Sequence, residues 1–143
     1  MKLSSPSFNA GGMIPDKFTC EGEEISPGLA IEEVPAAAKS LVLIVDDPDA
    51  PAGTFVHWVV FNIPPSTTAI PENGVPGEQG TNSARGKGYT SPCPPSGTHR
   101  YFFKLYALDT ALSLGGKTDK AAVETAMKGH VLDQAELMGR YSR

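Results

Sequence analysis

The sequence has no excess of basic residues. Its 143 residues include 12 Lys and Arg against 16 Asp and Glu, which gives a formal net charge of −4. Nucleic-acid-binding domains usually carry a basic excess or a basic stripe, because phosphate contacts supply much of their affinity. The lack of both argues against a nucleic-acid partner.

Long hydrophobic runs are also absent. The longest ones, Leu41–Val45 and Val59–Phe61, are far shorter than the roughly 20 apolar residues that span a membrane. The first twenty residues contain no apolar core of a secretory signal. We therefore predict a cytoplasmic protein without a membrane span.

Cysteine is scarce, and two common catalytic motifs are missing. Cys20 and Cys93 are the only cysteines and form no CxxC motif, so in a reducing compartment we expect free thiols rather than a disulfide. The stretch Gly80–Gly88 has five residues between its first two glycines, where a phosphate-binding P-loop needs four. No G-x-S-x-G nucleophile motif occurs either, so nothing in the sequence favours covalent catalysis.

Glycine and proline, by contrast, are abundant. The 15 glycines and 13 prolines make up about a fifth of the chain, against about 12% in an average protein. So many helix breakers argue against a helical bundle. The chain length fits one domain over residues 1–143.

Hydrophobic patterning predicts several strands and one helix. Residues 40–46, 55–63 and 99–108 are rich in β-branched and aromatic side chains, and weaker strands are expected near 26–31 and 131–141. Thr118 is a suitable cap for a helix through Met127, which Gly129 would end. The pattern is typical of a mainly β sandwich with one or two small helices.

An acidic corner follows the strand 40–46. Asp46, Asp47 and Asp49 alternate there with Pro48 and Pro51. One interpretation is a turn, because Asp and Pro are common turn residues. The other is a carboxylate placed at the sheet end to orient a ligand or a histidine.

Two histidines lie in predicted strands. His57 shares its parity with Phe55, Val59 and Phe61, so we expect it on the same face as these residues. It is either a core histidine with satisfied ring nitrogens or a ligand-binding group.

His99 and Tyr101 are two residues apart and should project from one face, with Arg100 pointing the other way toward a carboxylate or solvent. A two-histidine, one-carboxylate metal site is an alternative, although the spacing matches no short metal motif.

Three stretches in this order resemble the phosphatidylethanolamine-binding protein family, most closely its bacterial Raf-kinase-inhibitor-like (YbhB/YbcL) branch. They are DPDAP at Asp47–Pro51, the HW strand at His57–Asn62, and PPSGTHRY at Pro94–Tyr101. The resemblance runs from about Phe8 to Tyr141 and includes the ending HVLDQAELMGRY.

This resemblance implies a β-sandwich with a preformed anion pocket at one end of the sheet. By the matching positions, the pocket residues are Asp47, His57, Cys93, Pro95, His99 and Tyr101, supported by Asp49, Pro51 and Arg100. The resemblance further implies a small anionic or phosphorylated ligand and, by analogy with bacterial relatives, a homodimer. We expect no cofactor and no metal.

We expect non-catalytic binding of that ligand, together with regulation of a partner protein. The alternatives are inhibition of a kinase or protease through protein contact, and hydrolysis with a pocket histidine as general base. Anion binding should weaken as the pH rises through the histidine range, because the imidazolium ring is the better anion partner.

Overall fold

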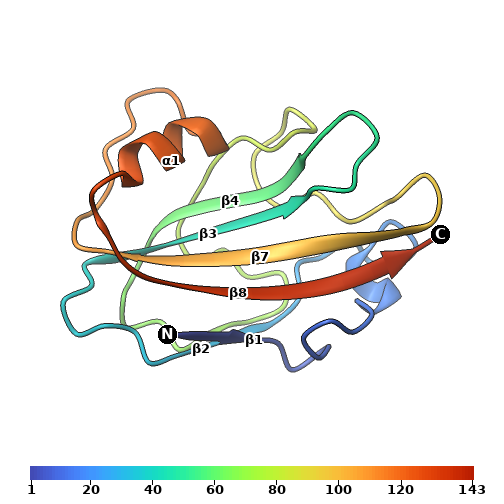
Figure 1. The fold of residues 1–143 in the computed structure, drawn as a ribbon, viewed down its shortest axis with the longest axis horizontal. Helices are drawn as coiled ribbons and strands as arrows, with labels where there is room; N and C mark the ends of the chain where they lie inside the picture. Colours follow the sequence, from blue (N-terminus) through green and yellow to red (C-terminus); the bar gives the residue numbers. More distant parts are fainter.

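Two antiparallel β-sheets and one α-helix make up the regular structure of the computed structural model, which describes residues 1–143 (Figure 1). In chain order the elements are β1 (Lys2–Ser4), the 3-10 helix η1 (Asp16–Phe18), β2 (Leu29–Glu32), β3 (Ser40–Asp47), β4 (Phe55–Ile63), β5 (Ala69–Ile70), β6 (Glu78–Gln79), β7 (Thr98–Leu108), α1 (Lys120–Met127) and β8 (Val131–Ser142). The small sheet has the strand order β1-β2-β5, and the large sheet has the order β6-β4-β3-β7-β8. The predicted mainly β sandwich is confirmed.

Strand β3 lies at the centre of the large sheet, and all eight of its residues are buried. Leu41, Leu43 and Val45 face the core shared with the small sheet, which contributes Leu3 and Ile31 among others. The opposite face of β3 packs in a second cluster that includes residues of α1. Both faces are therefore covered, which explains the uninterrupted apolar run in this strand.

The strand predictions hold for the long strands and fail for the short ones. The strands predicted at 40–46, 55–63 and 99–108 correspond to β3, β4 and β7, and the one at 131–141 corresponds to β8. The strand near 26–31 begins later, at Leu29. Strands β1, β5 and β6 have only two or three residues, too few for a periodic pattern to be recognised.

Helix α1 begins one residue later than predicted. Asp119, rather than Thr118, is the N-cap, and its carboxylate accepts a hydrogen bond of 2.9 Å from the backbone N–H of Ala122. Gly129 has a left-handed φ of 80° just after the helix, as expected of a residue that ends it. Val123 and Met127 are buried against the outer face of the large sheet.

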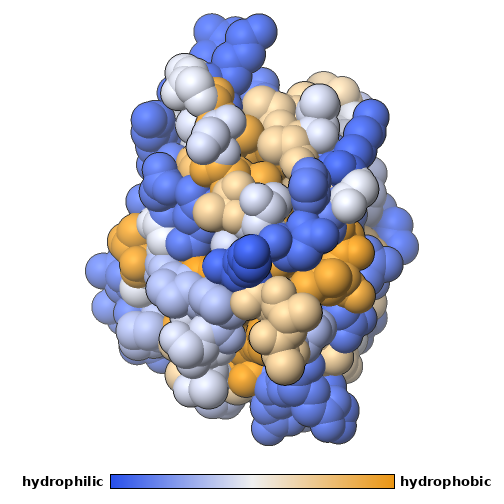
Figure 2. All heavy atoms as spheres, turned by 90° about the vertical axis from the view of Figure 1, so that its left-hand side faces the viewer, coloured by the Kyte–Doolittle hydropathy of each residue, from blue (hydrophilic) through white to orange (hydrophobic).

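The end of the molecule near α1 and the N-terminus has a mixed surface. Figure 2 shows hydrophobic groups lying between hydrophilic ones there, and Val131 and Leu132 at the start of β8 are among the exposed apolar residues of the chain. No helix has both the length and the apolar character needed to cross a membrane. The opposite end, where β3 finishes and β4 and β7 begin, holds the cavity described next (Figure 1).

Candidate functional site

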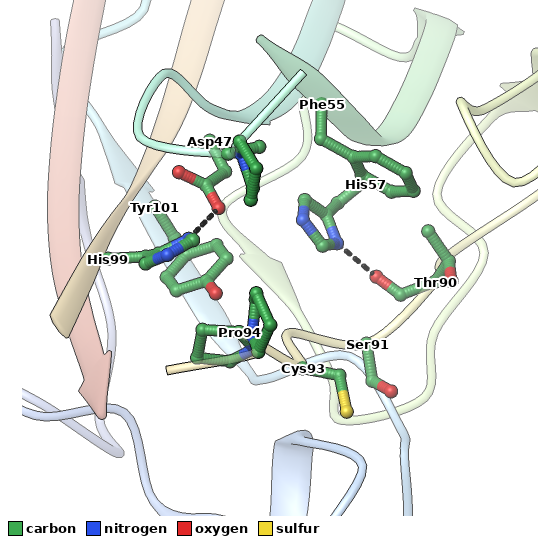
Figure 3. Close-up of a pocket in the computed structure, with 12 residues that line it drawn as sticks. Asp47, Phe55, His57, Thr90, Ser91, Cys93, Pro94, His99 and Tyr101 are labelled. Carbon is green, nitrogen blue, oxygen red and sulfur yellow. Dashed lines mark hydrogen bonds and ion pairs between the residues drawn. The ribbon is translucent and has the colours of Figure 1, made fainter. Parts of the chain in front are cut away.

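A cavity of about 240 Å³ opens at the end of the large sheet (Figure 3). It is lined by residues of β3, β4, β7 and the loops between them: Asp47, Ala50, Pro51, Phe55, His57, Thr90, Ser91, Cys93, Pro94, Pro95, His99 and Tyr101. All six residues that the sequence indicated as pocket residues are in this set. Their side chains thus surround one space, although they are up to 54 positions apart in the sequence.

Asp47 and His99 form a buried pair across β3 and β7. His99 Nδ1 lies 2.6 Å from Asp47 Oδ2, and the other carboxylate oxygen accepts the backbone N–H of Asp49 at 2.7 Å. An ionised carboxylate can only accept, so the Nδ1 proton of His99 lies between the two groups. The remaining ring nitrogen, Nε2, is left for other partners.

His57 is fixed by a backbone carbonyl from the opposite wall. Its Nδ1 donates to the carbonyl oxygen of Thr90 at 2.7 Å, and the N–H of Thr90 donates back to the carbonyl of His57 at 2.9 Å. A carbonyl only accepts, so Nδ1 carries the proton and Nε2 has a free lone pair in the neutral ring. Burial lowers the pKa of His57, although the bond to Thr90 and the charge of Asp47 oppose this effect.

A β-bulge places His57 on the inner face of β4. Val45 of β3 pairs with Trp58. The next residue of β3 pairs with Val56, which leaves His57 as an extra residue in β4. Such an extra residue breaks the strict alternation of side chains along the strand.

The prediction that His57 shares one face of the strand with Phe55, Val59 and Phe61 is therefore correct for Phe55 and wrong for the other two. Phe55 does share the face, with its ring centroid 4.8 Å from that of His57, and Tyr101 packs edge-on at 5.2 Å. Val59 and Phe61 instead face the α1 side of the sheet. The prediction assumed that side chains alternate strictly along β4. The bulge breaks this alternation, and nothing in the sequence marks its position.

Tyr101 supplies a hydroxyl with no partner. Only 1% of the residue is exposed, and its hydroxyl oxygen is buried without any hydrogen bond. Burial, and to a lesser extent the negative charge of Asp47, raises the pKa of Tyr101. The phenol therefore stays protonated and is a donor next to the two histidines.

The three carboxylates of the acidic corner share no side-chain partner. Only Asp47 lines the cavity. Asp46 is buried on the opposite face, where it binds Lys104 at 3.2 Å and Lys120 at 2.9 Å. Asp49 ties the corner to β7, because it accepts bonds from the backbone and the guanidinium of Arg100 at 2.8–2.9 Å.

These bonds from Arg100, first the guanidinium and then the backbone N–H, hold the pKa of Asp49 at about 2. Arg100 thus meets a carboxylate away from the cavity. Pro51, the third residue expected to give support, lies in the cavity wall itself.

The cysteines are not free, contrary to the prediction from the sequence. Cys20 and Cys93 form a disulfide that joins positions 73 residues apart. The prediction relied on an assumed reducing compartment, and sequence spacing could not show that the two loops meet. The disulfide also removes the thiol argument for a cytoplasmic location.

Thr90 and Phe55 line the cavity, although neither was predicted as a site residue. Thr90 contributes through its backbone carbonyl, which any residue type could supply. Phe55 lies two residues before His57 in the same predicted strand, and this spacing could have identified it as a neighbour of His57 on one face.

The two-histidine, one-carboxylate metal alternative has no supporting geometry. No group of three or more His, Cys, Asp or Glu side chains is arranged to hold a metal ion. Asp47, the only carboxylate of the cavity, already uses one oxygen for His99 Nδ1 and the other for the backbone N–H of Asp49. The arrangement instead offers a hydroxyl donor and two imidazole Nε2 atoms around a small space.

Comparisons with known proteins agree on one family. The model of the phosphatidylethanolamine-binding protein family matches residues 4–142. A UPF0098 protein of Methanothermobacter thermautotrophicus is 52% identical over 151 residues, which cover 100% of this chain and 99% of that protein. A homologue of phosphatidylethanolamine-binding protein from Chlamydia trachomatis has a structure with a TM-score of 0.96 and 44% identity, covering 99% of this chain and 97% of its own. E. coli YbcL, described as a member of the mammalian family, gives a TM-score of 0.90 at 29% identity over 99% of this chain and 98% of its own.

Proposed function

Because this chain belongs to the phosphatidylethanolamine-binding protein family, we propose that its cavity binds a small anion or the phosphorylated part of a larger molecule, without a chemical reaction. The observation that carries the proposal is the hydroxyl of Tyr101, a buried donor without a partner beside two imidazole rings. A buried polar group normally has a hydrogen-bond partner, so an acceptor in the cavity would satisfy it.

The charges around the cavity favour an anion of low charge. No Lys or Arg is among the lining residues, and Asp47 is the only carboxylate. Positive charge must then come from His57 or His99, whose Nε2 atoms become N–H donors when the rings are protonated. One imidazolium ring balances the charge of Asp47 and leaves the cavity neutral. A second imidazolium ring would balance one negative charge on the ligand.

The rest of the wall fits an organic group attached to that anion. Pro51, Phe55, Pro94 and Pro95 supply apolar surface around the polar groups. Small-molecule sites commonly combine such apolar walls with a few placed polar groups. The monoanionic form of a phosphomonoester fits this description, with its phosphate at the rings and its organic part along the prolines.

The direct test is a titration with inorganic phosphate and with phosphoethanolamine, followed by NMR of the three histidine rings. The resonances of His57 and His99 should move at millimolar ligand. His130 is a built-in control, because its Nδ1 also lies 2.7 Å from a carboxylate, that of Asp109, but on the exposed surface away from the cavity. Its resonances should stay in place.

Variants separate site binding from general anion effects. His57→Ala and His99→Ala should each weaken phosphate binding at least tenfold, while His130→Ala should leave it unchanged. Equal shifts of all three rings in the unmodified protein, or equal binding by all three variants, would exclude the proposed site. Turnover of phosphoesters that is lost in His57→Ala would show an enzyme instead of a binding protein.

A further inference from the structure

One wall of the cavity is held to a distant segment by several connections. The segment Thr90–Gly97 carries the cavity residues Cys93, Pro94 and Pro95, and it faces the segment Phe18–Glu24. Cys93 is bonded covalently to Cys20, whose backbone N–H donates to the carbonyl of Pro92 at 3.1 Å.

Two side-chain bonds reinforce the same junction. The Tyr89 hydroxyl donates to the Phe18 carbonyl at 2.8 Å, and the Ser91 hydroxyl donates to Glu24 at 3.0 Å. The disulfide is the only covalent connection in this junction, and the hydrogen bonds would keep the segments near each other if it opened.

The disulfide lies next to a guanidinium group at the surface. Arg143 Nη1 is 2.9 Å from the sulfur of Cys93 and 3.7 Å from that of Cys20, and Cys93 is exposed. Arg143 is itself fixed by two backbone bonds to Gly97 and by an ion pair with Glu21 at 3.4 Å. A cation beside a sulfur atom stabilises the thiolate, the form in which a cysteine leaves a disulfide.

We propose that the Cys20–Cys93 disulfide is a thiol-exchangeable latch on the cavity wall, with Cys93 as the leaving thiolate. An external thiolate attacks the Cys20 sulfur, forms a mixed disulfide there, and displaces the Cys93 thiolate beside Arg143. A second external thiolate then attacks the sulfur of the first external group. The two external groups leave together as a disulfide, and the Cys20 thiolate is released. The two thiols are oxidised to one disulfide, and the protein disulfide is reduced by the same two electrons.

Opening of the latch affects anion binding in two ways. The wall from Thr90 to Gly97 loses its covalent connection, and this wall holds the Thr90 carbonyl that fixes the His57 ring. In addition, the Cys93 thiolate places a negative charge in the cavity lining, which repels an anionic ligand. This second part of the inference depends on the proposed anion binding, whereas the exchange chemistry does not.

The exchange chemistry is tested with 2-mercaptoethanol on the full-length oxidised protein. After acid quenching and alkylation, mass spectrometry should find the mixed disulfide mainly on Cys20 and the alkyl group on Cys93. Arg143→Gln should slow the opening at least fivefold. Arg140→Gln, three residues earlier in β8, is the matched control, because the Arg140 side chain binds the Gly11 carbonyl instead. This variant should react like the unmodified protein. A mixed disulfide mainly on Cys93, or equal rates in all three proteins, would overturn the assignment of Cys93 as the leaving group.

The effect on the cavity is tested with inorganic phosphate and uncharged dithiothreitol. Reduction should weaken phosphate binding at least fivefold and move the ring resonances of His57. The Cys20→Ser/Cys93→Ser variant, which has no thiolate, should show a smaller loss. Unchanged affinity and unchanged His57 resonances would overturn the latch. If the oxidised protein itself does not bind phosphate, the proposed function fails, and the His57 resonances and the exchange products still decide about the latch.

Discussion

Tyr101 carries the only buried side-chain polar atom of the chain that lacks a hydrogen-bond partner. Tyr101→Phe removes an unpaired buried group, so the free energy of unfolding should stay equal or rise by up to about 1 kcal/mol. Phosphate affinity should fall roughly tenfold or more, because a hydrogen bond to a charged group contributes about 1.5–3 kcal/mol. Denaturant unfolding and calorimetric titration measure the two effects. A variant that loses stability but keeps its affinity would show that the hydroxyl has a structural role only.

His57 makes a specific prediction about pH. Burial lowers its pKa in the free protein, and a bound anion would raise it again, so binding should take up a proton. Affinity should therefore fall with rising pH over one window. This window begins at the pKa of His57 in the free protein, below about 6.5, and ends at its pKa in the complex. This window is more specific than the ordinary titration range of histidine, which the sequence alone indicated for the pH dependence of binding.

Dimethyl phosphate is a suitable probe for this effect, because its charge stays constant across the range. Calorimetry in two buffers of different ionisation enthalpy should detect proton uptake. In His57→Gln the uptake should be reduced or absent. Uptake of the same size in that variant would assign the proton to another group.

The same shift affects the stability of the free protein. The unfolded chain has an ordinary histidine and binds a proton more readily than the folded one. The free energy of unfolding should therefore decrease as the pH falls through about 6.5 toward the lower folded pKa of His57. His57→Gln should flatten this part of the curve of stability against pH. An unchanged slope would contradict the burial argument.

At the scale of the elements, regular strands could be predicted and local irregularities could not. His99 and Tyr101 share a face as expected, because β7 pairs with β8 in an unbroken register around them. The face of His57 was missed because β4 bulges at that residue. A bulge depends on how two strands pair, and a single strand sequence does not contain that information.

The start of α1 gives a prediction with an internal control. Asp119 caps the helix, whereas Thr118 makes no such bond although threonine is also a common N-cap residue. Asp119→Ala should lower the free energy of unfolding by about 1 kcal/mol, and Thr118→Ala should have a clearly smaller effect. Thermal unfolding of both variants measures the difference. Equal losses would mean that the cap bond does not stabilise the helix.

At the scale of the whole molecule, the cavity depends on loops that meet across the fold. Asp47, His57 and His99 could be predicted together only through the resemblance to a family. The hydrophobic period and the residue spacing did not show that the end of β3 and the starts of β4 and β7 meet at one place. The partner of Cys93 was not predicted, because the path of two loops 73 residues apart decides which cysteines meet. Long-range contacts of this kind are set by the packing of both sheets.

The disulfide should also contribute to global stability. It closes a loop of about 73 residues, and such a link restricts the unfolded chain. The Cys20→Ser/Cys93→Ser variant should therefore lose about 2–4 kcal/mol in its free energy of unfolding, which a domain of typical stability survives. The reduced unmodified protein is the matched comparison and should lose a similar amount in the same denaturant titration. A loss below about 1 kcal/mol in both would mean that the hydrogen bonds between the two segments already hold them without the covalent link, and that the disulfide acts on the cavity wall rather than on the fold.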